Sequence, residues 1–248
     1  MLEMRVVHAD VRDLKAIITT LSKLVDEALL VFKPEGVELV TVDRAHIALI
    51  KLSLPSSAFQ EYDVSEEFKF GFNAGYLSKL LKTATRKESF VMESESPDVV
   101  KIKLIGGVER EFTVKNLDIV PPEIPEINLE FAVKATVNSA GLKKAVSEAK
   151  AVTDTLTISA NENEVKLSAE GETKIEVELD KDSGGLIDIQ VDQPSTSSYD
   201  VAYMDDVMGL TRLSDTTYIA FSTNKPLLME FGQESTGKVT YLLAPKIA

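Results

Sequence analysis

Few residues in this sequence could carry covalent or metal chemistry. There are no cysteines, which excludes a disulfide scaffold, a thiolate metal site and a cysteine nucleophile. His46 lies near Asp43, but no serine motif accompanies it, and a lone histidine beside a strand, like His8, is usually structural. Asp205 and Asp206 could suggest a metal site, yet their expected position at a helix start favours capping. No phosphate loop, dinucleotide glycine pattern or zinc spacing is present, so we predict no enzyme, no metal and no cofactor.

Basic side chains gather in segments with helical periodicity. Four such segments together hold eleven Lys and Arg against five acids, a net charge of +6 within a chain of net charge −13. Solvated faces could explain this for one helix, but positive helices in both halves of an acidic chain favour a polyanion facing them. Lysine dominates and no aromatics interleave, which predicts contact with phosphates rather than with bases. The predicted DNA-facing residues are Lys15, Lys79, Lys82, Arg86, Lys143, Lys144 and Arg212.

The elements that position these residues follow from apolar periodicity. Helical stripes are predicted at 10–24, 74–87, 139–151 and, least clearly, 203–213. Asn73 and Ser139 are the expected N-caps of the second and third helices. On the second helix Lys79, Lys82 and Arg86 should share one exposed face.

Elsewhere the chain alternates apolar and polar residues in short runs, which predicts half-buried antiparallel strands. Gly106-Gly107 and Gly184-Gly185 are interpreted as hairpin turns. A shift of 128 residues relates the two halves, carrying for example Leu14 to Leu142 and Val37 to Val165. Three prolines between residues 121 and 125 predict an extended linker.

We therefore predict an α+β fold of two similar domains, each with antiparallel sheets and two helices. The predicted boundaries are 1–117 for the first domain, 118–127 for the connector and 128–248 for the second domain. The N-terminus is charged from residue 3, and no apolar run reaches the ~18 residues of a membrane span, so we expect a cytoplasmic protein.

Two strands are expected to be unpaired on one side, at 110–115 and 174–179. Exposed edges of this kind invite pairing with another chain. The predicted subunit-interface residues are Arg110, Phe112, Val114, Lys174, Ile175 and Val177. Four helices at ~9 Å spacing cover roughly 36 Å, so a ring of three subunits would open to ~34 Å, enough for a duplex, and a ring of two to only ~23 Å.

The sequence also resembles a known family. The run 42–47, Val-Asp-Arg-Ala-His-Ile, resembles the Asp-x-x-His segment of proliferating cell nuclear antigen, the archaeal and eukaryotic sliding clamp. The run 241–247, Tyr-Leu-Leu-Ala-Pro-Lys-Ile, resembles its C-terminal signature, and 124–126, Ile-Pro-Glu, the end of its connector. The run 24–28 is similar to archaeal clamps, some of which are rings of three different subunits. The chain departs from the pattern at Pro122, where a larger apolar residue is common, and at Ser147 and Gly209, where basic residues are common.

This resemblance implies a non-catalytic processivity factor that encircles double-stranded DNA, nucleoid-associated in an archaeon. Its implied partners are a clamp loader and, through short peptide motifs, DNA polymerase, flap endonuclease and DNA ligase. The ring would be a homotrimer or a heterotrimer with related subunits. The implied partner-peptide pocket comprises Val42, His46, Ile47, Pro122, Ile124, Pro226, Tyr241, Ala244 and Pro245.

Three alternatives stay open at this stage. The apolar residues near the connector, among them Ile119, Ile124 and Ile127, could merely seal the linker to the core. A replication or repair nuclease would need a carboxylate cluster that binds Mg²⁺. An acidic adaptor without a DNA-encircling role would not be retained on closed circular DNA.

Overall fold

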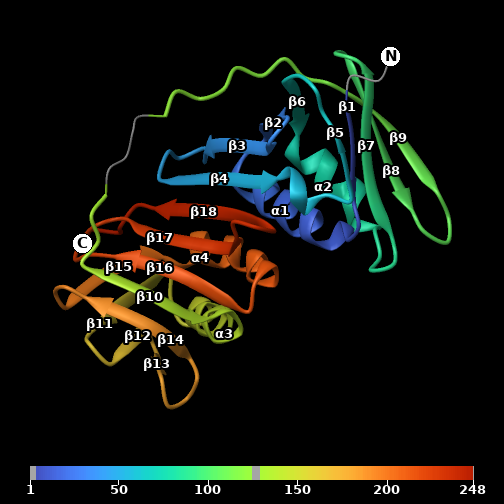
Figure 1. Cartoon of the computed structure of the whole chain (residues 1–248). Coiled ribbons are helices and arrows are strands. Elements are labelled where there is room, and N and C mark those ends of the chain that lie inside the picture. The colour runs from blue at the N-terminus through green and yellow to red at the C-terminus, as the bar shows by residue number, and fades with distance from the viewer. Residues whose placement is uncertain (1–3, 125–128, 248) are drawn as a thin grey trace. The chain divides into compact units, whose positions relative to one another are not determined.

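The computed structural model describes residues 4–124 and 129–247, and these form two compact units. Unit 1 comprises Met1–Arg44, Ile50–Glu123 and Gln233–Val239, and unit 2 comprises Ala45–Leu49, Ile124–Gly232 and Thr240–Ala248. Figure 1 shows the elements of both. Between Lys115 and Val133 the described residues form no helix or strand, as the prolines of the predicted linker require.

The two halves of the chain contain the same elements in the same order. The first half runs β1 (Met4–His8), α1 (Val11–Leu24), β2 (Glu27–Lys33), β3 (Gly36–Val42), β4 (Ala48–Pro55), β5 (Glu61–Asp63), β6 (Phe68–Asn73), α2 (Ala74–Lys82), β7 (Ser89–Ser96), β8 (Val99–Ile105) and β9 (Arg110–Lys115), with a 3₁₀ turn, η1, at Ser56–Ala58. The second half runs β10 (Val133–Asn138), α3 (Ser139–Lys150), β11 (Thr155–Ala160), β12 (Glu164–Glu170), β13 (Lys174–Asp180), β14 (Leu186–Val191), β15 (Ser195–Asp200), α4 (Val201–Val207), a 3₁₀ segment η2 (Met208–Leu213), β16 (Thr216–Phe221), β17 (Leu227–Gln233) and β18 (Gly237–Leu243).

Strand order repeats as well. The order β5-β1-β7-β8-β9 in the first half corresponds to β14-β10-β16-β17-β18 in the second, and β4-β3-β2-β6 corresponds to β13-β12-β11-β15. Helices α1 and α3 begin at Val11 and Ser139, which are 128 residues apart. The predicted duplicated α+β architecture of antiparallel sheets with two helices per half is therefore confirmed.

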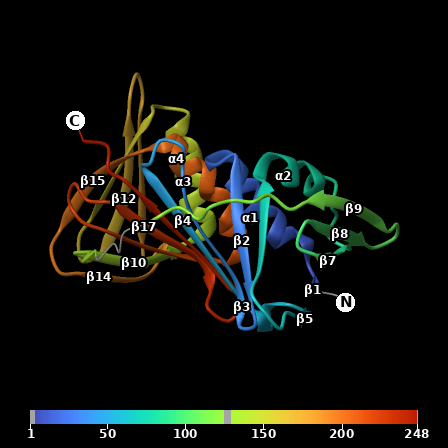
Figure 2. The same ribbon diagram turned by 90° about the horizontal axis from the view of Figure 1, so that it is seen from above.

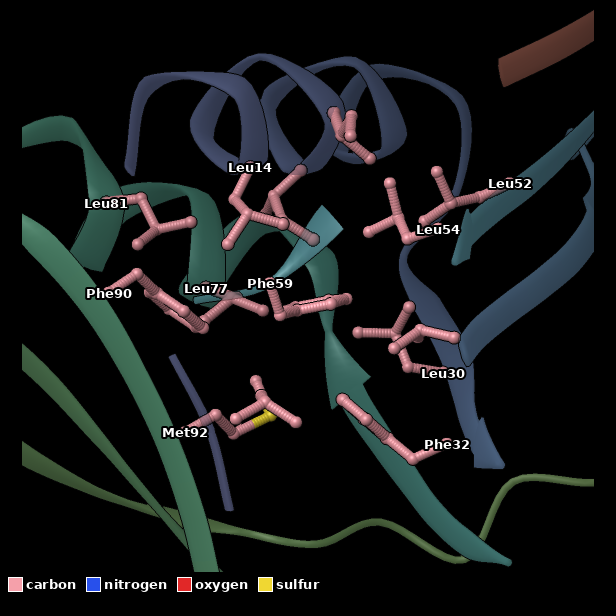
Figure 3. A pocket seen from close by; sticks show the side chains of 14 residues that line it. Leu14, Leu30, Phe32, Leu52, Leu54, Phe59, Leu77, Leu81, Phe90 and Met92 are labelled. Carbon is pink, nitrogen blue, oxygen red and sulfur yellow. The ribbon is translucent and has the colours of Figure 1, made fainter. Parts of the chain in front are cut away.

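The core of unit 1 lies between its helices and its two sets of strands. Leu14 and Ile17 of α1, Leu77 of α2, Phe90 of β7 and Leu30 of β2 all point into it, as Figure 3 shows for the labelled side chains. They surround an entirely apolar cavity of about 30 Å³. Burying these stripes drives the folding of the unit, and the polar faces of α1 and α2 stay outside. Figure 2 shows α1 and α2 side by side.

Two helix predictions need correction at their starts. Asn73 caps α2 as expected, since its side chain accepts from the Tyr76 amide at 2.8 Å. The cap of α3 is Asn138 rather than Ser139, because Asn138 Oδ1 accepts from Gly141 N at 2.9 Å. The Ser139 hydroxyl is instead buried against the hydroxyl of Thr217 at 2.8 Å.

The fourth helix begins earlier than predicted. Asp200 caps α4, and its Oδ1 accepts from the amides of Ala202 and Tyr203. Asp205 and Asp206 therefore lie within the last turn of α4, so the capping role assigned to them is wrong. Their carboxylates sit one turn too late to accept from the free amides at the helix start.

Of the two predicted glycine hairpins, only one is present. Gly106-Gly107 joins β8 to β9, which pair antiparallel from Leu104–Arg110 to Val99–Lys115. Gly184-Gly185 joins β13, which pairs with β12, to β14, which pairs with β10 in another sheet. This turn is stabilised locally, because Asp180 Oδ1 accepts from the Ser183 amide at 2.7 Å, and it redirects the chain between sheets.

Candidate nucleic-acid and partner-binding surfaces

The basic face of unit 1 is carried by α2 and the turn behind it. Lys79 and Lys82 are exposed near the C-terminal end of the helix. Arg86 is also exposed, but α2 ends at Lys82, so the prediction that all three lie on one helical face is wrong for Arg86. The helix ends because the Ala84 amide bonds to the Leu81 carbonyl at 3.0 Å in a tighter turn.

Lys15 of α1 is tied to the end of α2. Its Nζ donates to the carbonyl oxygens of Lys82 at 2.8 Å and Ala84 at 3.3 Å. Cations suit this position, because the last carbonyls of a helix have no intrahelical partner and carry partial negative charge. The half-buried Lys15 thus joins the two helices. A DNA phosphate that contacts Lys15 would share its ammonium group with these two carbonyl oxygens.

The basic residues of unit 2 are more dispersed. Lys143 and Lys144 are exposed on α3, and Lys144 lies 3.9 Å from Glu148 one turn later. Arg212 is exposed near the end of η2. Lys150 pairs with Asp205 at 2.5 Å, and the pKa of its ammonium is raised by that hydrogen bond, so one α3 cation is neutralised within the unit.

Two exposed residues beside the predicted DNA-facing ones were not included in that set, although Lys87 was counted among the eleven basic residues of the helical segments. Tyr76 is 52% exposed, three residues before Lys79 on α2, so the expectation that no aromatics interleave with basic residues is wrong for this helix. Lys87 is exposed beside Arg86. The apolar periodicity of α2 could have identified Tyr76, because it lies off the stripe formed by Leu77 and the later leucines.

The two predicted edge strands lie at sheet edges. β9 has β8 as its neighbour and β13 has β12, each at the end of its strand order. Phe112 and Ile175 are half-buried on these strands. On β13, Val177 is half-buried on the same face as Ile175. Lys174 lies on the opposite face and pairs with Glu176 at 3.0 Å.

The remaining predicted interface residues of β9 have partners inside unit 1. Val114 is buried. The Arg110 guanidinium bonds to Glu88 at 2.5 Å and to the Thr83 hydroxyl at 2.8 Å, so its charge is used within its own unit.

An ionic ladder crosses the strand set that ends in β9. Arg5 bonds to Glu61 at 3.2 Å and to Glu93 at 2.8 Å, and Lys103 lies 2.5 Å from Glu93 and 3.5 Å from Glu111. The hydrogen bond from Lys103, followed by that from Arg5, lowers the pKa of the buried Glu93. Alternating charges on successive strands stabilise cross-strand pairs and keep this face polar.

The C-terminal segment is held within unit 2. The Ala244 amide donates to the Ile47 carbonyl at 2.8 Å, and the Lys246 amide donates to the Ser198 carbonyl at 2.7 Å. Tyr241 is fully buried with its hydroxyl donating to the Tyr203 carbonyl at 3.3 Å, so its ring belongs to the core.

Other predicted pocket residues remain available at the surface. In unit 2, Ile47 is 38% exposed, and Ile124, Pro226 and Pro245 are half-exposed. His46 is exposed and adopts a left-handed φ of 59°, a region that few residues other than glycine occupy. In unit 1, Val42 is half-buried and Pro122 is exposed. Pro125, Glu126 and Ile127 lie outside the described residues.

A buried tyrosine fixes the loop before Pro226. The Tyr199 hydroxyl donates to the Lys225 carbonyl at 2.9 Å, and burial raises the pKa of Tyr199 to about 12. The phenol therefore stays protonated at any physiological pH and keeps this bond.

Within the described residues, no group of three or more His, Asp or Glu side chains is placed to hold a metal ion. In the same residues, no helix has the length and apolar character needed to cross a membrane.

Comparison with known proteins gives a consistent result over the whole chain. The family model described as proliferating cell nuclear antigen, N-terminal domain, matches residues 1–121, and the C-terminal domain model matches 123–246. The "DNA polymerase sliding clamp 1" of Sulfurisphaera ohwakuensis is 56% identical over 245 residues, covering 99% of this chain and 100% of that protein. The "DNA polymerase sliding clamp" of Pyrococcus furiosus is 34% identical, covering 98% of each chain.

Solved structures agree with the fold. The chain matches a crystal structure of PCNA from Thermococcus kodakaraensis with a TM-score of 0.91 at 29% identity, over 98% of this chain and 100% of that chain. It matches a PCNA2–PCNA3 complex from Sulfolobus tokodaii with a TM-score of 0.92 at 28% identity, over 98% and 99% of the chains. With both domain models matched in order along a duplicated fold, the chain belongs to the proliferating cell nuclear antigen family.

Proposed function

We propose that this chain is one subunit of a DNA sliding clamp, a processivity factor that encircles duplex DNA and has no catalytic activity of its own. The observation that carries the proposal is the match of both family domains to a duplicated fold that bears exposed lysines on its helices. Full-length relatives bear the name DNA polymerase sliding clamp, at up to 56% identity among those described above.

Contact with DNA would be loose and independent of base sequence. Lys79, Lys82, Lys143 and Lys144 are exposed ammonium groups on long, flexible stems, which neutralise phosphates without reading bases. Arg212 would add a fifth charge. Loose contact suits sliding, since ammonium groups exchange readily between successive phosphates.

The ring would close through the edge strands. Among the described residues, β9 and β13 are each paired on one side only. An antiparallel pairing between chains would satisfy both open sides and bury Phe112 and Ile175. Three subunits give an opening wide enough for a duplex. One of the similar solved structures is a complex of PCNA2 with PCNA3, which supports a heteromer with related subunits as an alternative to a homotrimer.

Replication enzymes would attach through short peptides near the connector. Ile47, Ile124, Pro226 and Pro245 present partly exposed apolar atoms, and the Tyr199 hydrogen bond holds the loop that carries Pro226. Because the residues that line the site are already ordered, less conformational entropy is lost on binding. A peptide with a single helical turn that carries an aliphatic and an aromatic anchor would therefore suffice for binding. Polymerase, flap endonuclease and ligase are the partners that the family resemblance implies, together with a clamp loader.

The decisive test of the clamp is topological. Light scattering first shows whether the chain assembles alone or only with related subunits. The assembled protein is then loaded onto nicked circular DNA, and the nick is sealed. A clamp is retained at high salt on the closed circle and lost when the circle is cut. Equal loss from closed and cut DNA would refute encirclement and favour an acidic adaptor, and DNA degradation would favour a nuclease.

The peptide site is tested by titrating a fluorescent peptide that carries both anchors. Ile124→Ala combined with deletion of residues 244–248 should weaken binding at least tenfold, whereas Thr223→Ala, an exposed neighbour, should not. Deletion stops at 244 because Tyr241 and Leu243 are buried core residues whose loss would unfold unit 2. Equal affinity in both proteins would place the pocket elsewhere.

A further inference from the structure

The turn that follows α2 presents unusual uncompensated charge. Arg86 and Lys87 are exposed there, and within the described part of the chain neither forms an ion pair. An acid, Glu88, comes directly after them in the sequence and could be expected to cancel part of this charge. Its carboxylate instead bonds to Arg110 and to the Thr85 amide.

Glu88 is engaged on both carboxylate oxygens. Its side chain is only 8% exposed, Oε1 accepts from Arg110 Nη2 at 2.5 Å, and Oε2 accepts from the Thr85 amide at 2.5 Å. The bond from the Thr85 amide is the main cause of the lowered pKa of Glu88, and Arg110 adds to it. The Glu88 side chain packs against Gly106 so closely that a β-carbon at Gly106 would lie only 2.6 Å from Glu88 Cγ. Its negative charge is therefore neutralised from inside, and the turn keeps its own positive charge.

The same contacts fix the backbone of the turn. Arg110 Nη1 donates to the Thr83 hydroxyl at 2.8 Å, and Lys15 donates to the carbonyls of Lys82 and Ala84. The Thr85 amide is held by Glu88. Both ends of the turn are thus anchored to other elements, while Arg86 and Lys87 at its tip are not.

The repeated fold provides an internal comparison. In unit 2 the Asp215 carbonyl accepts from the Ser139 amide at 2.9 Å, as the Glu88 carbonyl accepts from the Val11 amide at 3.4 Å, so the two acids hold equivalent backbone positions. Asp215 is nevertheless exposed, and β18, the counterpart of β9, contains no arginine. Since unit 2 folds without this buried pair, the fold alone does not require it.

We propose that the turn Thr83–Lys87 is a second phosphate-binding element beside the lysines of α2, and that Glu88 and Arg110 position it. The inference rests on the proposed DNA-encircling function. Its ligand is the phosphodiester backbone, contacted by Arg86 and Lys87. A pre-ordered turn loses little conformational entropy on each contact, so it binds phosphates more strongly than two lone side chains on a flexible loop would.

The direct test is the double variant Arg86→Ala/Lys87→Ala in the assembled protein. Binding to a short linear duplex is followed by fluorescence anisotropy across a salt series. Each lost phosphate contact should lower the slope of log affinity against log salt by about 0.9, or about 1.8 per copy of this chain. The control is Lys33→Ala, which breaks the pair between Lys33 on β2 and Glu38 on β3 and should leave the slope unchanged. An unchanged slope in the double variant overturns the proposal.

The positioning role is tested by Arg110→Met and Arg110→Lys. The first keeps the apolar stem and should lower the slope toward that of the double variant, whereas the second keeps the charge and should restore most of it. A purely structural role would lower the melting temperature and leave the slope unchanged. Because Arg110 lies on an edge strand, Glu88→Gln serves as a second variant whose substituted residue is not part of β9, with the same expected loss of slope.

Failure of the proposed function would be distinguishable. If the wild-type protein is not retained on closed circular DNA, the clamp itself is refuted. If it is retained and the slope does not respond to Arg86, Lys87 or Glu88 substitutions, only this inference falls.

Discussion

Replacing Leu77 by alanine should destabilise unit 1 strongly. Leu77 is 1% exposed on α2 and its side chain lines the apolar cavity shown in Figure 3. A buried Leu→Ala change costs about 2.7–5 kcal/mol and rises by about 24 cal/mol per Å³ of cavity. The existing 30 Å³ would join the new space and add about 0.7 kcal/mol, so we expect a loss of about 4 kcal/mol in the free energy of unfolding.

The opposite change should stabilise the same site. Val37 is 2% exposed on β3 and also lines the cavity, so Val37→Ile places one more methylene into space that is already empty. Burial of one methylene contributes about 0.8 kcal/mol, provided that no neighbour must move. We therefore expect a gain of about 0.5–1 kcal/mol in unfolding free energy.

Both variants are measured by guanidinium denaturation followed by circular dichroism, with wild type alongside. Since the chain has two units, the transition assigned to unit 1 is compared and its m-value should stay constant. A cost below about 1.5 kcal/mol for Leu77→Ala would mean that α2 does not pack on this core as described. A loss above about 1 kcal/mol for Val37→Ile would mean that the cavity cannot accept a methyl group.

Three further predictions concern charge and assembly. The double variant Lys79→Glu/Lys82→Glu should reduce processive synthesis at moderate salt. Its melting temperature should stay within a few degrees of wild type, because both side chains are exposed. Unchanged processivity would mean that these two lysines do not contact DNA. Glu93 has a lowered pKa in the folded protein, so its contribution to stability is present above the unfolded carboxyl pKa of about 4.3 and is lost as the pH falls through the lower folded pKa. Glu93→Gln should therefore lose less stability than wild type between pH 7 and pH 3 in urea titrations, and parallel losses would contradict this. Val177→Lys on the edge strand β13 should weaken subunit assembly, measured by light scattering, because it places a cation at a half-buried edge position. Full assembly of this variant would exclude β13 as an interface.

The duplicated architecture could be predicted from sequence because its signals are local. Alternation with a period of two identifies strands, and apolar stripes identify helices, wherever they occur along the chain. The shift of 128 residues then aligned the halves, and it recurs as the starts of α1 and α3. Edge strands β9 and β13 were found for a similar reason, since each alternates with few buried residues.

Helix boundaries and turns were predicted less well, because neighbouring elements decide them. α2 ends at Lys82 rather than residue 87, and Lys15, 67 residues away in the sequence, binds the carbonyl at that end. The Gly184-Gly185 turn connects two sheets, a feature that depends on which strands β13 and β14 pair with.

Residue types and their order were enough to establish the composition of the surface: an acidic chain with exposed lysines on its helices, no cysteine, and a duplicated strand and helix order. Which of those charges are free to act depends on the folded packing. Lys15, Lys150 and Arg110 are bonded to partners 67, 55 and 22 residues distant, whereas Lys79 and Lys82 remain exposed. A charge is neutralised by whatever lies within a few ångströms, and distances of that kind between remote residues are set by the packing of elements, which no local pattern encodes.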